Sequence, residues 1–90
     1  AVGTITVWTP RTSTRIVLTQ LVVASDLANS IAFYFGNLAG TKIVQFNIAA
    51  SSQVAIDLLA DGETIDRTLV ANTRVSGTDG VKITAVGFEL

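Results

Sequence analysis

The chain has 90 residues, of which 49% are hydrophobic and only 14% are charged, and its formal net charge is -1. It contains no Cys and no His, which excludes disulfides, thiolate and imidazole zinc sites, and the Ser-His-Asp and Cys-His catalytic arrangements. A chain of this length forms one domain, and its near-neutral charge predicts neither a nucleic-acid partner nor a membrane partner.

The N-terminal segment predicts a short strand followed by a break. Residues 4–8, TITVW, alternate threonine with apolar side chains, which is typical of a strand with one face toward solvent. Residues 9–14 include Pro10 and a cluster of hydroxyl side chains, which end a ladder and favour turns. We therefore expect residues 1–14 to form an N-terminal arm or an edge strand.

The next two predicted strands, residues 15–24 and 31–35, are apolar at almost every position and are joined by a polar turn. Strict alternation places Ile16, Leu18, Val22 and Ala24 on one face of the first strand and Val17, Thr19, Leu21 and Val23 on the other. Neither face is suited to water, so other strands or other subunits must cover both.

The rest of the chain continues the two-residue period. Residues 42–48 and 53–59 alternate as strands, although a helix over residues 49–60 is an alternative because its residues tolerate that state. After a turn at residues 60–63, residues 67–73 predict a weaker strand.

The final predicted strand, residues 81–90, follows the Asp-Gly turn signal at Asp79. Its apolar residues change phase around residues 85–87, which predicts a bulge or a strand that leaves one sheet for the other. Seven or eight strands separated by turns about 8–12 residues apart indicate an all-β fold: an antiparallel β-sandwich, jelly-roll-like, with residues 1–90 in a single domain. The strand order stays open between a jelly roll and another Greek-key sandwich.

No catalytic group stands out, and we predict that the chain is not an enzyme and needs no cofactor. Lys42 and Lys82 lie in alternating strands, where a solvent-facing lysine is the ordinary interpretation. The only acidic cluster is Asp57, Asp61, Glu63 and Asp66. Its oxygens suit Ca²⁺, but the alternation of a calcium loop is missing, so an exposed turn is favoured over a metal site.

The low charge of the chain predicts a surface that is partly hidden in contacts with other subunits. The candidate oligomer or partner contacts are Trp8, Arg15, Leu21, Val23, Tyr34, Phe88 and Leu90. Trp8 and Tyr34 also allow an alternative function, in which their rings bind a carbohydrate or a receptor.

Three stretches of the sequence carry a resemblance to a known group of proteins. They are RIVLTQLVVASDLANSIAFYFG, KIVQFNIAASSQV and RTLVANTRVSGTDGVKITAVGFEL. The chain resembles small jelly-roll virion proteins of tailed bacteriophages, such as head decoration proteins and modules of tail and fibre proteins. The resemblance implies a viral structural protein without catalysis, located in the virion and assembled in the host cytoplasm. It also implies a homotrimer that binds the major capsid protein or another virion protein.

Overall fold

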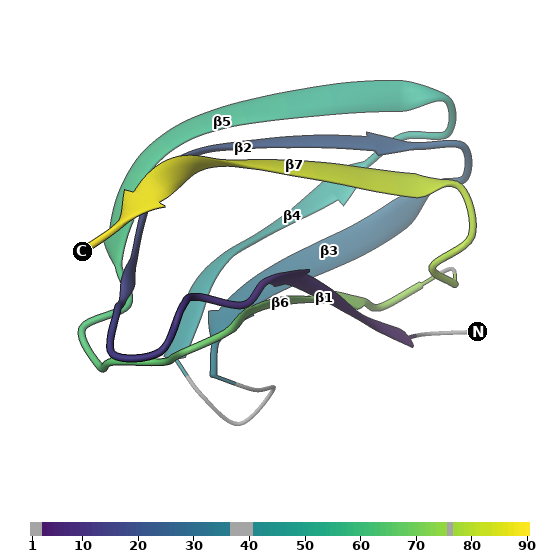
Figure 1. The fold of residues 1–90 in the computed structure, drawn as a ribbon. Coiled ribbons are helices and arrows are strands. Elements are labelled where there is room, and N and C mark those ends of the chain that lie inside the picture. Colours follow the sequence, from purple (N-terminus) through teal and green to yellow (C-terminus); the bar gives the residue numbers. More distant parts are fainter. Residues whose placement is uncertain (1–2, 37–40, 76) are drawn as a thin grey trace.

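A computed structural model describes residues 3–36, 41–75 and 77–90, and it confirms the predicted antiparallel β-sandwich (Figure 1). The seven strands are β1 (Gly3–Trp8), β2 (Ile16–Ser25), β3 (Asn29–Phe35), β4 (Thr41–Ile48), β5 (Ser52–Asp61), β6 (Leu69–Thr73) and β7 (Val81–Glu89). Within the described residues there is no helix long and apolar enough to cross a membrane.

The strands form two layers, a four-stranded sheet in the order β1-β6-β3-β4 and a three-stranded sheet in the order β5-β2-β7 (Figure 1). β3 and β4 are neighbours in one sheet, whereas every other pair of consecutive strands lies in different sheets. As a result, strands far apart in the sequence pair with one another: Gly3 lies opposite Thr73, and Ile16 lies opposite Glu89. The predicted N-terminal strand is β1, at an edge of the four-stranded sheet.

The core lies between the two sheets and consists mainly of the inward side chains of β2 and β3. Its buried members are Ile16, Leu18, Leu21, Val23, Ile31, Phe33, Phe35, Ile48, Leu69 and Ala71. The rings of Phe33 and Phe46 stack with their centroids 6.1 Å apart. Burial of this apolar surface, at about 25 cal/mol per Å², is the main source of stability. The chain has no Cys and no His, so it lacks disulfides and the usual zinc ligands.

The strict alternation expected for the first long strand is wrong beyond Thr19. The register of β2 with both of its neighbours shifts between Leu18 and Gln20. Opposite β7, Thr19 is an extra residue, and an extra residue of this kind reverses the phase of the strand. Leu21 and Val23 therefore share the core with Leu18 instead of facing the opposite side.

The predicted change of phase in the last strand is also wrong. β7 alternates without interruption between half-buried and exposed residues and pairs with β2 along its whole length. The register shift belongs to β2, the partner strand, because the additional residue is there. Gly87 lies so close to β2 that a Cβ atom would overlap the carbonyl oxygen of Val17.

The region that allowed a helix, residues 49–60, forms a turn followed by the regular strand β5. Inward residues of β5 such as Val54 and Leu58 pack against the core, so burial on one side of a sheet outweighs the weak helical preference. The expected weaker strand is β6, which is shorter than predicted and begins at Leu69.

Candidate functional site

The outer face of the three-stranded sheet carries an apolar surface. β7 turns Val86, Phe88 and, just beyond its end, Leu90 outward, and these side chains are 44%, 51% and 59% exposed. Leu59 on the outer face of β5 is 81% exposed. The outward face of an antiparallel sheet is normally polar, so several exposed large apolar residues on one such face indicate a contact surface. We call Leu59, Val86, Phe88 and Leu90 the apolar surface.

The centre of this outer face is less exposed than its flanks. Val17 of β2 lies opposite Phe88 of β7 and is only 6% exposed, although it points away from the core. Polar neighbours on the same face are bonded to each other: the Gln20 amide nitrogen donates to the Asp57 carboxylate at 3.0 Å. On this part of the face, burial of the exposed apolar side chains would therefore give the largest favourable free energy.

The outer face of the four-stranded sheet has a different character. Ala32, Tyr34 and Val70 form a small cluster on it, and each is at most 7% exposed. Tyr34 lies opposite Lys42 in β4 and Val70 in β6. Because neighbouring side chains already cover it, the Tyr34 ring is not presented to a ligand or a second subunit.

Besides Tyr34 and Arg15, the predicted contact residues fall into three groups. Phe88 and Leu90 belong to the apolar surface. Leu21 and Val23 are 0% exposed and lie in the core, so they are absent from the surface that another molecule could touch. Trp8 is half-buried and packs against the core.

Arg15, another predicted contact residue, forms an ion pair within the chain. Its Nε atom lies 2.8 Å from the Asp61 carboxylate, and both side chains are partly exposed. Such a surface pair contributes about 0–1 kcal/mol, and it occupies the guanidinium that we expected to meet another subunit.

Three of the four acidic residues weighed as a calcium site, Asp57, Asp61 and Asp66, accept hydrogen bonds from protein donors. Asp57 accepts from Gln20, and Asp61 accepts from Arg15 and from the backbone N–H of Glu63 at 2.9 Å. Asp66 accepts from the backbone N–H of Ser13 at 2.8 Å. Over residues 3–36, 41–75 and 77–90, no three acidic side chains are grouped so as to hold a metal ion.

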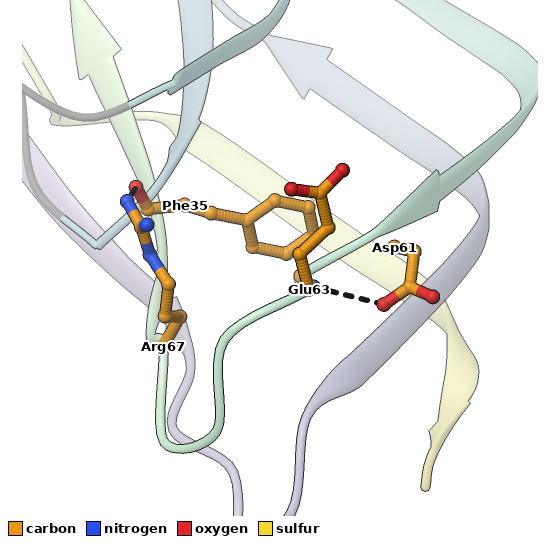
Figure 2. A pocket seen from close by; sticks show the side chains of 5 residues that line it. Phe35, Asp61, Glu63 and Arg67 are labelled. Atoms are coloured by element: carbon orange, nitrogen blue, oxygen red, sulfur yellow. Dashed lines mark hydrogen bonds between the residues drawn. The ribbon is translucent and has the colours of Figure 1, made fainter.

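A small cavity lies between the end of β3 and the turn after β5 (Figure 2). It has a volume of about 60 Å³ and is lined by Phe35, Asp61, Gly62, Glu63 and Arg67. Arg67 Nη2 donates a 2.7 Å hydrogen bond to the carbonyl oxygen of Phe35, as Figure 2 shows. Ligand pockets usually measure about 300–1,000 Å³, so this cavity is too small for an organic ligand.

A shallower hollow lies at the other end of the three-stranded sheet. It measures about 290 Å³, is open to solvent, and is lined by Ala24, Ser25, Asp26, Ser51, Ser52 and Gln53. Two of its hydroxyls already donate to nearby backbone carbonyls, Ser25 to Leu27 and Ser52 to Ala50. The hollow has no aromatic wall on which a sugar ring could stack.

Sequence reasoning missed Glu89, whose carboxylate accepts hydrogen bonds from three residues between β1 and β2. It accepts hydrogen bonds from the backbone N–H of Arg11 at 2.6 Å, the Thr14 hydroxyl at 2.8 Å and the Trp8 indole N–H at 3.3 Å. These hydrogen bonds lower the pKa of the Glu89 carboxyl to about 2, and the bond from the Arg11 backbone N–H has the largest effect. A signal was present, because Glu89 occupies the same inward row of β7 as Val81, Ile83 and Ala85.

Comparison of the chain with protein-family models, with curated proteins and with solved structures found no match in any of the three.

Proposed function

We propose that the chain is a non-enzymatic structural protein of a virion, a capsid decoration protein that self-associates and binds the particle surface. The observation that carries self-association is the apolar surface on the outer face of the three-stranded sheet. The virion assignment, with the trimer and the capsid partner that go with it, rests on the resemblance of the sequence to jelly-roll virion proteins of tailed bacteriophages.

The composition of the chain and the placement of its exposed apolar residues both favour self-association. With 14% charged residues, the chain has few groups that keep an exposed face in water. Phe88, Val86 and Leu59 lie on the two flanking strands of one sheet, and their side chains are all exposed on its outer face, where a second molecule could bury them. Burial of such a surface favours association through the hydrophobic effect.

The alternative, a carbohydrate- or receptor-binding module, has less support. It relied on the rings of Trp8 and Tyr34, but Trp8 packs against the core and Tyr34 is 7% exposed. Stacking on a ligand needs an accessible ring face.

The test is the mass of the protein in solution by light scattering, at micromolar and at nanomolar concentration, for the wild type and for Phe88→Asp. The expected result is an oligomer for the wild type and a lighter species for Phe88→Asp with an unchanged circular dichroism spectrum. Thr84→Asp is the matched control, because Thr84 is also exposed on the outer face of β7 but lies outside the apolar surface. A wild-type monomer at both concentrations would refute self-association. If an oligomer forms, a binding assay with phage capsids that do not carry this protein tests the virion assignment separately.

A further inference from the structure

Residues 8–14, which we call the strap, carry the chain from the end of β1 in one sheet to the start of β2 in the other (Figure 1). The strap contains one turn of its own, in which the N–H of Thr14 donates to the carbonyl oxygen of Arg11. This bond is internal, so it shapes the strap without attaching it to either sheet. The single proton of the Thr14 hydroxyl is shared between the Arg11 carbonyl oxygen and the Glu89 carboxylate.

The two ends of the strap are held by the sheets: Trp8 pairs with Leu69 of β6 and packs against the core, and Arg15, just beyond the strap, exchanges backbone hydrogen bonds with Leu90. Between these ends, one carboxylate on another strand collects most of the side-chain hydrogen bonds. Glu89 of β7 accepts from Trp8 at the start of the strap, from Arg11 in its middle and from Thr14 at its end. Arg11 adds a second bond through its Nε atom at 3.3 Å. Four donors on one carboxylate are charge-assisted bonds, which are about twice as strong as neutral ones.

The second attachment is to the loop between β5 and β6. The N–H of Ser13 donates to Asp66, and the N–H of Asp66 donates to the carbonyl oxygen of Thr14 at 2.7 Å. Ser13 and Asp66 both have left-handed backbones, with φ values of 64° and 66°. Non-glycine residues adopt this conformation at a cost, so this contact gives the strap less net stabilisation than its two hydrogen bonds suggest.

We propose that Glu89 is a latch for the strap: its charged carboxylate holds residues 8–14 against β7, and without that charge the strap opens while both sheets stay folded. The inference is independent of the proposed virion function. Arg15 at this end of the molecule pairs with Asp61, and Asp66 accepts from Ser13. Arg11 is therefore the cation that faces Glu89, and its side chain is 79% exposed.

Glu89→Gln at neutral pH is the direct test, because glutamine keeps the shape of the side chain and removes its charge. Two readouts are available: amide hydrogen exchange along the chain, and the fluorescence of Trp8, which is the only tryptophan. We expect protection of the strap amides to fall about tenfold to a hundredfold, with a red-shifted Trp8 emission. Amides of β3 and β6 should keep wild-type protection.

Asp57→Asn is the matched control, because Asp57 is an exposed carboxylate that bonds to Gln20 and has no contact with the strap. It should leave the exchange of the strap and the Trp8 emission unchanged. Unchanged protection of the strap in Glu89→Gln would overturn the proposal. If Glu89→Gln unfolds throughout, Arg11→Ala decides, because it removes the Nε donor to Glu89 and keeps both the carboxylate and the bond from the Thr14 N–H to the residue 11 carbonyl oxygen. Faster exchange confined to the strap supports the latch, and no change refutes it.

Discussion

Arg67 closes the end of β3 by donating a hydrogen bond from Nη2 to the carbonyl oxygen of Phe35, at 2.7 Å. The guanidinium lies directly beneath Gly36, where a Cβ atom would come within 2.7 Å of the same nitrogen. Gly36 has a φ of 93°, which glycine adopts readily and other residues do not. The chain can thus leave β3 sharply while its last carbonyl keeps a partner.

Arg67→Ala should lower the free energy of unfolding by about 1–3 kcal/mol, because the Phe35 carbonyl loses a charged donor in a partly buried place. Urea denaturation measures the change. Arg74→Ala is the matched control: Arg74 is exposed, and its backbone N–H donates to the Ser30 carbonyl oxygen, a bond that alanine keeps, so the cost should stay within about 0.5 kcal/mol. Equal effects of the two variants would contradict the assigned role of Arg67.

Truncation of two leucines should affect stability very differently, because the bulge at Thr19 turns Leu21 into the core whereas Leu59 of β5 is exposed. Leu21→Ala should cost about 2–5 kcal/mol, since Leu21 is fully buried and the change leaves a cavity. Leu59→Ala should change the stability of the monomer by no more than about 0.5 kcal/mol, because Leu59 is 81% exposed. Thermal or urea unfolding distinguishes the two. A tolerated Leu21→Ala would mean that β2 alternates strictly and that Leu21 faces outward.

Gly87→Ala should destabilise the fold by about 1–3 kcal/mol or more, because the added methyl group overlaps the backbone of β2 at Val17. Gly3→Ala is the comparison, since its methyl group makes an ordinary 3.9 Å contact with the Thr73 hydroxyl and one close contact, at 2.9 Å, with the Thr78 side-chain methyl. That methyl group ends a side chain on an exposed turn and can rotate away. Denaturation curves of the two variants should therefore differ clearly, and similar curves would contradict the close approach of β7 to β2.

The stability of the fold should depend on the charge of Glu89. Its pKa in the folded chain is about 2, below its ordinary value of 4.5, so the folded state favours the ionised form. This contribution to stability is complete above about pH 4.5 and is lost as the pH falls toward 2. Denaturant unfolding at a series of pH values should show a steeper loss for the wild type than for Glu89→Gln. Parallel curves would show that the carboxylate is not stabilised by folding.

Much of the sandwich is readable from the sequence because most strands have one buried face. β5 alternates inward and outward side chains along its length, and that pattern survives in the structure. β2 is different, because it is apolar at nearly every position on both sides. A reversal of phase at Thr19 leaves no mark in such a sequence, which is why Leu21 and Val23 were assigned to the wrong face.

Some residues of the candidate site can likewise be predicted from the sequence pattern, and others cannot. Phe88 and Leu90 could be proposed as contact residues because apolar side chains at alternate positions of a terminal strand share a face. The partners of Glu89 could not be predicted, since Arg11 is 78 residues away in the sequence and meets it only after the sheets have formed. Pairings of this kind depend on strand order, which periodicity does not encode.

The pairing of β1 with β6 also has a consequence for synthesis on the ribosome. Gly3 bonds to Thr73, so the first strand is made long before its partner exists. During that interval β1 has two unpaired edges, and unpaired strands are where nascent chains associate wrongly. Its outward residues, Thr4 and Thr6, have polar hydroxyl side chains, and the segment is short. Both properties lower the risk of aggregation between the synthesis of β1 and the synthesis of β6. The modest hydrophobicity of β1 therefore suits the order in which the chain is made.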